Sequence, residues 1–323
     1  MKIGILGCGA YGFALSSVLV RNKHDVTMWT FSEEEYEYLT TKKECPKLPG
    51  YKIPEVINIT TKIEESIIDK DLIIMAIPAF AFESTTKLLK EHIKKKQVVL
   101  IATKGIQQDT CLFLNDVFAK YCSNKIAVIS GPTFAVDVIN QVPIGLSLAT
   151  KNNHVEEIVQ KAFANSTTKL RRTNDIIGVE ICGSIKNVMA IASGILAGME
   201  VTDSTRALFL TESMNDIKEL INALGGKKQT ILSFSGFGDI LMTCTSPNSR
   251  NYSFGYLIGK GATKEEIDEY LQKTTVEGMY TLKSIRKLVR KNKVKMPIIN
   301  LIYDIIVNGK EKEKLLTFLI KKD

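Results

Sequence analysis

The sequence predicts an α/β fold in which a doubly wound parallel sheet is followed by an all-helical domain. Short apolar runs alternate with helical patterns over the first 150 residues, whereas from about residue 155 onward the β-rich runs stop and the hydrophobic period becomes helical. Apolar strands separated by helices are typical of a parallel sheet that is covered on both faces. We therefore expect one domain over residues 1–155, with its end between 155 and 175, and a helical domain over residues 175–323.

Six apolar, β-rich runs are the expected strands of the sheet, and a helical pattern at Phe13–Arg21 lies between the first two. The runs are Lys2–Leu6, Asp25–Trp29, Leu72–Ile77, Val98–Ala102, Ile126–Ser130 and Ile144–Ala149.

Two long helices are expected in the second domain. In Arg206–Leu224 the apolar residues advance by 4, 3, 4 and 3 positions, and Gly225-Gly226 follows as a stop signal. Ile176–Met199 has the same spacing, but its other faces are also small or apolar, with two charged residues in all. A helix that is apolar nearly all round is buried, so we expect Ile176–Met199 to be the central helix of its domain.

The composition narrows the class of protein. The 323 residues are 45% hydrophobic and 24% charged, which excludes a disordered, collagen-like or coiled-coil chain. The 43 Lys and Arg against 35 Asp and Glu leave a net charge of +8, which suits an anionic partner such as a nucleotide, a phosphorylated metabolite, a nucleic acid or an acidic lipid. The basic residues are dispersed rather than interleaved with aromatic residues, so we do not expect a nucleic acid as the main partner.

Six cysteines and three histidines show no C-x-x-C spacing and no Cys–His cluster. We therefore expect neither a metal site nor a disulfide framework, and free thiols indicate a reducing, cytoplasmic compartment. The uncharged stretch Ile3–Val20 contains four glycines, which make a poor membrane helix, and no other uncharged run reaches spanning length. We expect a soluble protein without a signal peptide or a membrane span.

The run Gly7-Cys8-Gly9-Ala10-Tyr11-Gly12 matches G-x-G-x-x-G, directly after the first expected strand and before a helix. In that context it is typical of a Rossmann-type domain, in which the glycines let the backbone approach a dinucleotide pyrophosphate at the helix N-terminus. The end of the second strand, Trp29-Thr30-Phe31-Ser32, offers neither an acidic residue for the ribose of NAD nor an arginine for the phosphate of NADP. The motif predicts a nicotinamide dinucleotide and leaves the choice between NAD and NADP open.

Lys186 is the most informative single charge, because it lies in the middle of a helix that otherwise avoids charge. Burial tends to lower the pKa of a lysine, which can then exchange protons near neutral pH. The alternative is a lysine whose side chain extends to solvent. The next residue, Asn187, is also polar in an apolar context and favours a site.

Two further groups of polar residues are candidates for a site. Gly236–Asp239 and Thr243–Ser246 precede Ser249–Asn251, where an arginine between a serine and an asparagine can hold a phosphate. An N-capping loop is the alternative interpretation of this composition. Ser130–Thr133 and Thr103–Gly105 follow expected strands, and ligands of α/β sheets gather at the carboxyl ends of strands.

Together these motifs resemble the bacterial NAD(P)-dependent glycerol-3-phosphate dehydrogenases. The matching strings follow the family's order from residue 3 to about 280; they are Ile5–Gly12, Thr103–Ile106, Ser130–Ala135, Ile185–Val188 with Ala190–Ala192, Gly236–Asn251 and Val276–Gly278. The resemblance implies a cytoplasmic, homodimeric enzyme that reversibly reduces dihydroxyacetone phosphate to sn-glycerol 3-phosphate with NAD(P)H, for glycerophospholipid synthesis.

The resemblance also implies roles for individual residues. Lys186 would donate and accept the proton, Asp239 would orient the reacting centre, and Lys104 would touch both cofactor and substrate. Substrate-binding residues would be Lys104, Gly131, Thr133, Lys186, Asn187, Asp239, Ser249, Arg250 as the phosphate anchor, and Asn251. Cofactor-binding residues would be Gly7, Gly9, Ala10, Tyr11, Gly12, Phe31, Lys104, Ala135, Arg250 and Glu277.

Two positions depart from the family's pattern, and two other functions compete. The family commonly has serine where this chain has Ala10, and arginine or histidine where it has Phe31, so we lean to NAD over NADP.

A related 3-hydroxyacid dehydrogenase or ketopantoate-type reductase would hold a carboxylate in place of the phosphate. A dinucleotide-sensing regulator without turnover would need no proton donor such as Lys186.

Overall fold

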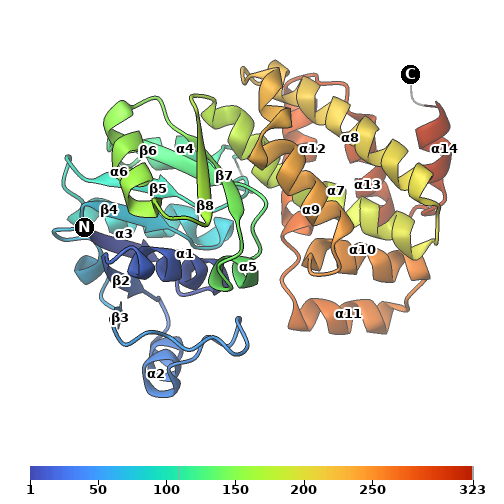
Figure 1. The fold of residues 1–323 in the computed structure, drawn as a ribbon. Helices are drawn as coiled ribbons and strands as arrows, with labels where there is room; N and C mark the ends of the chain where they lie inside the picture. Colours follow the sequence, from blue (N-terminus) through green and yellow to red (C-terminus); the bar gives the residue numbers. More distant parts are fainter. Residues whose placement is uncertain (109, 322–323) are drawn as a thin grey trace. The chain divides into compact units, whose positions relative to one another are not determined.

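The computed structural model describes residues 1–108 and 110–321 and divides into two compact units. The first, here called the sheet unit, comprises Met1–Lys104 and Leu114–Ile176. The second, called the helical unit, comprises Gly105–Phe113 and the chain from Ile177 onward. Figure 1 shows the strands confined to the first unit and the long helices to the second. The predicted fold class, a Rossmann-type sheet domain followed by a helical domain, is confirmed.

The sheet has eight strands in the order β3-β2-β1-β4-β5-β6-β7-β8. Their bounds are β1 Lys2–Leu6, β2 Asp25–Trp29, β3 Ile57–Thr60, β4 Leu72–Met75, β5 Val98–Ile101, β6 Ile126–Ser130, β7 Ile144–Ala149 and β8 Thr168–Thr173. Neighbouring strands are parallel except β6 and β7, which pair antiparallel. The sheet is thus predominantly parallel, as predicted; the one antiparallel pair is not evident from the sequence, because an apolar run such as β7 has the same pattern in either direction.

The expectation that β-rich runs stop at about residue 155 is wrong. The edge strand β8 has the sequence Thr-Lys-Leu-Arg-Arg-Thr and alternates between half-buried and exposed residues, so it contains no apolar run. The short strand β3 at the opposite edge was also not predicted; its second residue, Asn58, is exposed. Edge strands need less apolar surface than central ones, which weakens their signal in the sequence.

Helices cover both faces of the sheet. They are α1 Ala10–Arg21, α2 Glu33–Lys42, α3 Phe82–His92, α4 Leu114–Ala119, α5 Ala135–Ile139 and α6 Asn153–Phe163, with short 3₁₀ turns at η1 Ile63–Ser66 and η2 Ala79–Ala81. Helix α1 packs against α5 and α6, and α3 packs against α4. Residues Ile3, Ile5 and Ile74 belong to the core cluster beneath α1, while the alternate residues Ile73 and Met75 are equally buried outside that cluster. Both faces of the strands are therefore shielded from water.

The helical unit is built around one helix. Its elements are α7 Ile176–Gly198, α8 Asp203–Ala223, η3 Lys228–Leu232, η4 Phe234–Gly238, α9 Asp239–Thr245, α10 Arg250–Lys260, α11 Lys264–Lys273, α12 Glu277–Lys291, α13 Pro297–Asn308 and α14 Lys314–Lys321. Every residue of α7 from Gly178 to Leu196 is buried, which confirms the predicted central helix. Its length and composition would also suit a membrane span, but 89% of its most apolar stretch is buried inside the protein.

Glycines allow α7 and α10 to cross closely. A Cβ atom on Gly255 would lie 1.9 Å from the carbonyl oxygen of Ile191, and one on Gly194 would lie 2.0 Å from that of Tyr252. Both distances are far below van der Waals contact, so the two backbones meet only because these positions lack a side chain. This crossing holds the first turn of α10, which carries Arg250 and Asn251, against the central helix.

The segment Gly105–Phe113 belongs to the helical unit although it precedes three strands of the sheet. Ile106 and Phe113 form an isolated antiparallel bridge, and both side chains lie in the core cluster around α7. The predicted range 1–155 for the first domain therefore includes a segment that packs with the second unit.

Candidate functional site

In the sheet unit, the glycine-rich turn between β1 and α1 has the geometry of a pyrophosphate cradle. Gly7 has φ +118°, and a Cβ there would lie 2.5 Å from the carbonyl oxygen of Ala76. A Cβ on Gly12 would lie 2.2 Å from the carbonyl oxygen of Gly7, whereas one on Gly9 would meet nothing within 4 Å. Gly7 and Gly12 are thus required by the turn itself, while Gly9 leaves open space in front of the α1 N-terminus, where a phosphate fits.

Four of the predicted residues meet at the carboxyl edge of the sheet. The Nζ atom of Lys104, which follows β5, donates to the carbonyl oxygen of Gly131 over 3.3 Å and lies 5.9 Å from the ring centroid of Tyr11. The hydroxyl of Thr133, which follows β6, donates to the Tyr11 hydroxyl over 3.3 Å. Ala135 begins α5 directly afterwards. The edge therefore offers one ammonium group, two hydroxyls and a helix N-terminus next to the glycine-rich turn.

The end of β2 presents an aromatic ring and a carboxylate. Phe31 is 83% exposed, with its ring 6.5 Å from that of Trp29. Glu35 in the first turn of α2 accepts a hydrogen bond from the Thr30 hydroxyl and pairs with Lys47 at 3.1 Å. Glu35 lies beyond the strand end, and the start of α2 brings its carboxylate back to Thr30.

Cys8 lies inside the glycine-rich turn, but its thiol is not a reactive group. It is 3% exposed, and burial, together with the charge of Glu35, raises its pKa well above the ordinary value. The thiol stays protonated near neutral pH, and only the thiolate is a nucleophile. Among the described residues no group of three or more His, Cys, Asp or Glu is placed to hold a metal ion.

In the helical unit, Lys186 is buried and its charge is paired. The side chain is 7% exposed, and Nζ donates to Asp239 Oδ1 over 2.5 Å and to Thr243 Oγ1 over 3.2 Å. Asp239 is fully buried at the start of α9, one turn before Thr243. The carboxylate favours the ammonium form of Lys186 where burial alone would favour the neutral amine. Thr243, which belongs to the candidate polar group Thr243–Ser246, is the third member of this cluster.

A second chain of hydrogen bonds lies beside the Lys186 cluster. Asn187 donates from Nδ2 to Glu277 Oε2 over 3.2 Å, and its Oδ1 accepts from Asn251 Nδ2 over 3.0 Å. The backbone N–H of Gly278 donates to Asn251 Oδ1 over 2.8 Å. These bonds fix the side chains of α7, α10 and α12 relative to one another, so three residues predicted separately form one network.

Arg250 and Ser249 begin α10, and the structure gives them different surroundings. The Ser249 hydroxyl caps the helix by accepting from the Tyr252 N–H over 3.3 Å, as the capping interpretation of this loop predicts. Arg250 is exposed, and its guanidinium group makes no hydrogen bond or ion pair with any residue in the described ranges 1–108 and 110–321. An arginine at a helix N-terminus beside a buried asparagine leaves its five N–H donors available to an anion.

Both halves of the chain match family models. The model described as NAD-dependent glycerol-3-phosphate dehydrogenase N-terminus matches residues 2–156, and the model of the C-terminus matches residues 175–317. A glycerol-3-phosphate dehydrogenase [NAD(P)+] of Thermoanaerobacter sp. (strain X514) is 35% identical over 323 residues, covering 100% of this chain and 98% of the relative. The relative of that name in Wolbachia pipientis wMel is 36% identical over 328 residues, covering 99% and 100%.

Solved structures give the same result for the fold. The crystal structure of glycerol-3-phosphate dehydrogenase from Coxiella burnetii superposes with a TM-score of 0.94 at 29% identity and covers 99% of both chains. A PanE/ApbA family ketopantoate reductase from Ralstonia eutropha JMP134 reaches a TM-score of 0.56 at 14% identity, covering 94% of this chain and 99% of the other, which indicates a shared fold alone. With both family models matched over most of its length, the chain belongs to the NAD-dependent glycerol-3-phosphate dehydrogenase family.

Proposed function

We propose that this protein catalyses the reversible NAD(P)H-dependent reduction of dihydroxyacetone phosphate to sn-glycerol 3-phosphate, and that it supplies glycerol phosphate for lipid synthesis. The observation that carries the proposal is the buried Lys186–Asp239–Thr243 cluster on α7 and α9. A buried ammonium group with a defined carboxylate partner is a proton donor for a developing alkoxide. A dinucleotide-sensing protein would have no use for such a group.

Lys186 acts as the general acid in reduction and the general base in oxidation. Reduction of the ketone builds negative charge on its C2 oxygen, and an ammonium group at hydrogen-bond distance stabilises that charge and then transfers a proton to it. Asp239 and Thr243 hold Nζ in one position through bonds of 2.5 and 3.2 Å. The bound dinucleotide supplies or accepts the hydride.

The substrate phosphate is assigned to the start of α10. Arg250 provides an exposed guanidinium group, and the Asn187–Asn251 pair provides amide groups on the adjacent helices. Anchoring the phosphate away from the reacting carbon uses binding energy to orient C2. Of the residues predicted for substrate in the sheet unit, we retain Lys104, Gly131 and Thr133, which lie together at the sheet edge. Ser249 contributes mainly as the helix cap.

Dinucleotide binding is assigned mainly to the sheet unit, whereas substrate-binding residues come from both units. The open space at Gly9 and the N-terminus of α1 would hold the pyrophosphate, with Ala10 and Tyr11 at the first helical positions. Phe31 offers a flat apolar surface at the end of β2, and Ala135, Arg250 and Glu277 are the further assigned contacts. Because neither arginine nor histidine stands at Phe31, we favour NAD over NADP. We also propose that the protein is a homodimer and that it is cytoplasmic.

The decisive experiment follows NADH absorbance after addition of dihydroxyacetone phosphate to the purified protein. We expect NADH to be consumed with dihydroxyacetone phosphate and not with 2-keto or 3-keto acids. Consumption with the keto acids alone would replace the proposal with a 3-hydroxyacid dehydrogenase or ketopantoate-type reductase. NADH binding without turnover of any of these substrates would leave a sensor as the function.

A further inference from the structure

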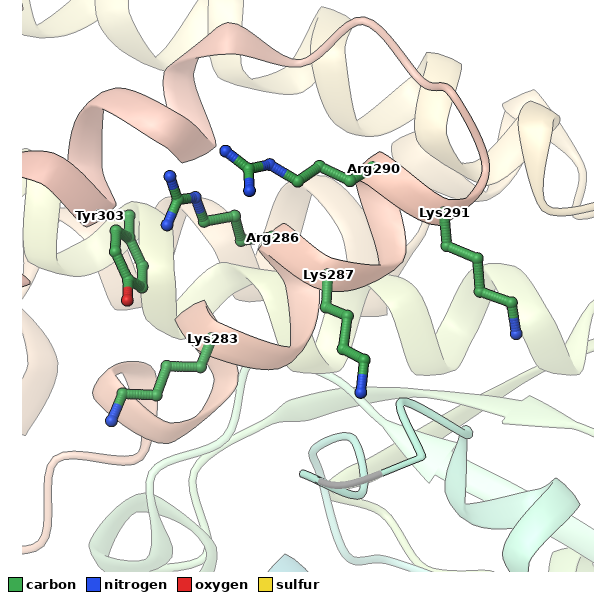
Figure 2. A pocket seen from close by; sticks show the side chains of 6 residues that line it. All are labelled: Lys283, Arg286, Lys287, Arg290, Lys291 and Tyr303. Atoms are coloured by element: carbon green, nitrogen blue, oxygen red, sulfur yellow. The ribbon is translucent and has the colours of Figure 1, made fainter.

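Helix α12 carries a basic face that the proposed reaction does not use. Its cations recur at intervals of 3, 1, 3 and 1 residues, which places them on one side of a helix; they are Lys283, Arg286, Lys287, Arg290 and Lys291. The opposite side is apolar and buried, with Leu282, Ile285, Leu288 and Val289 in the core of the helical unit. The five cations and Tyr303 of α13 line a hollow of about 550 Å³, here called the α12 pocket (Figure 2).

One cation of the pocket is held in place by the protein itself. The guanidinium carbon of Arg286 lies 3.8 Å from the ring centroid of Tyr303, and Nε donates to Asn300 Oδ1 over 3.1 Å. Figure 2 shows Arg286 extended toward this ring, with Arg290 beside it. A cation stacked on an aromatic ring is pre-organised and loses little freedom when an anion binds.

Part of the positive charge in the α12 pocket has no side-chain partner in the part of the chain that the structure describes. The carboxylate of Asp304 is shared between two cations: its Oδ1 lies 4.0 Å from Arg286 Nη2, and its Oδ2 lies 3.7 Å from Lys310 Nζ. Within residues 1–108 and 110–321, Lys283, Arg290 and Lys291 are exposed and form no hydrogen bond or ion pair through their side chains. Three of the five cations therefore have no partner of their own among the described residues, and the hollow concentrates positive potential.

Stability of the helix does not account for this arrangement. Cations four positions apart on a helix repel each other, and three such pairs occur here: Lys283 with Lys287, Arg286 with Arg290, and Lys287 with Lys291. The helix dipole favours cations in the last turn, which covers Arg290 and Lys291 but not Lys283 in the second turn. An anion bound in the pocket would offset the repulsion between these cations.

We propose that the α12 pocket binds a soluble anion carrying two or more phosphate groups. The cations from residue 283 to 291 extend about 12 Å along the axis at 1.5 Å per residue, whereas one phosphate hydrogen-bonds to donors only about 3 Å from its oxygens. A membrane surface is disfavoured because the apolar face of α12 is buried in the core and cannot enter lipid. A second copy of the chain is disfavoured because a two-fold axis would bring like charges together.

The test is a calorimetric titration of the full chain with sodium tripolyphosphate. Saturating NADH and sn-glycerol 3-phosphate are present to occupy the proposed active site. The variant Lys283→Gln/Arg290→Gln/Lys291→Gln removes the three unpaired cations and keeps the Arg286–Tyr303 stack. The control Lys95→Gln/Lys96→Gln/Lys125→Gln removes the same charge from exposed positions near the amino ends of β5 and β6.

We expect the α12 variant to bind tripolyphosphate about 100-fold more weakly, which is roughly 2.8 kcal/mol at 1.4 kcal/mol per tenfold change. The control should change the affinity by less than about threefold, because it removes none of the side chains that line the pocket. An Arg250→Ala variant should keep native tripolyphosphate affinity even if its catalysis fails, which separates this pocket from the proposed substrate site. Thermal unfolding of each variant verifies that it is folded.

Three results would overturn the proposal. Absence of tripolyphosphate binding by the native protein would show that there is no site. An equal loss of tripolyphosphate affinity in the α12 variant and in the control would show that the net charge of the protein, and not the pocket, attracts the anion. A parallel sedimentation assay uses vesicles of phosphatidylcholine with and without phosphatidylglycerol. Binding to the phosphatidylglycerol vesicles without tripolyphosphate binding would identify a membrane-facing surface instead.

Discussion

Replacing Lys186 with methionine removes the ammonium group while keeping much of the side-chain volume. In the native protein, Nζ lies 2.5 Å from Asp239 Oδ1 and 3.2 Å from Thr243 Oγ1, and Asp239 has no solvent exposure. The variant therefore buries a carboxylate that has lost its ammonium partner. Breaking a buried pair in this way costs about 3–5 kcal/mol of stability, and loss of a general acid lowers turnover about 10²- to 10⁴-fold.

A double variant separates the two effects. In Lys186→Met/Asp239→Leu the buried charge is gone from both partners, so we expect the free energy of unfolding to return to within about 1–2 kcal/mol of the native value. Turnover should stay as low as in the single variant, because the proton donor is still missing. Denaturant unfolding measures stability, and initial rates of NADH oxidation by dihydroxyacetone phosphate measure turnover.

The pH dependence of stability gives a further check on Lys186→Met. Burial without the ammonium group raises the pKa of Asp239 above the value of about 3.9 in the unfolded chain. The folded variant then holds a proton that the unfolded chain releases, so its stability falls as pH rises from about 4 through the raised pKa. Its deficit against native protein should disappear in acid. If the turnover of Lys186→Met stays within about tenfold of the native value, the loss is smaller than that expected for a missing general acid, and the assigned role is refuted.

Four other predictions concern different parts of the chain. Arg250→Ala should raise the KM for dihydroxyacetone phosphate about 10- to 100-fold, the scale of a charge-assisted hydrogen bond, and lower kcat/KM much less for unphosphorylated dihydroxyacetone, which loses only the dinucleotide contact; an equal loss with both ketones would reject the phosphate role. Gly255→Ala should destabilise the protein by about 1–3 kcal/mol, because its Cβ would lie 1.9 Å from the Ile191 carbonyl oxygen. Phe31→Arg should raise kcat/KM for NADPH relative to NADH about tenfold, and an unchanged ratio would place the 2′-phosphate elsewhere. Burial raises the pKa of Cys244 above its value in the unfolded chain, so stability should fall above about pH 9 by up to about 1.4 kcal/mol per pH unit, and Cys244→Ala should flatten that slope.

Patterns with a strong apolar signal were sufficient to predict the central part of the fold. Strand β1 and helix α7 are found where their sequences predict them, because both are buried and their apolar residues leave little ambiguity. Strand β8 was missed because its edge position tolerates three basic side chains in six residues. The placement of Gly105–Phe113 in the helical unit was not predictable, because Ile106 and Phe113 look like any apolar loop residues until the core around α7 is present.

The residues of the candidate site also differ in how far the sequence could predict them. Lys186 could be predicted as a site residue because it is a charged residue in an apolar, buried helix. A buried charge requires a partner, but the sequence of the helix does not identify that partner. Asp239 and Thr243 lie 53 and 57 residues further along the chain, and the turn at η4 and the start of α9 direct both toward Nζ. No periodicity in the sequence encodes that meeting: the polar composition marked Asp239 and Thr243 as candidates, and only the structure shows that both contact Lys186. The basic face of α12 is the reverse case, since its spacing is plain in the sequence but a run of lysines and arginines on a helix is ordinarily a solvated surface. It became a candidate site only when Tyr303, Asn300 and Asp304 of α13 were found beside Arg286.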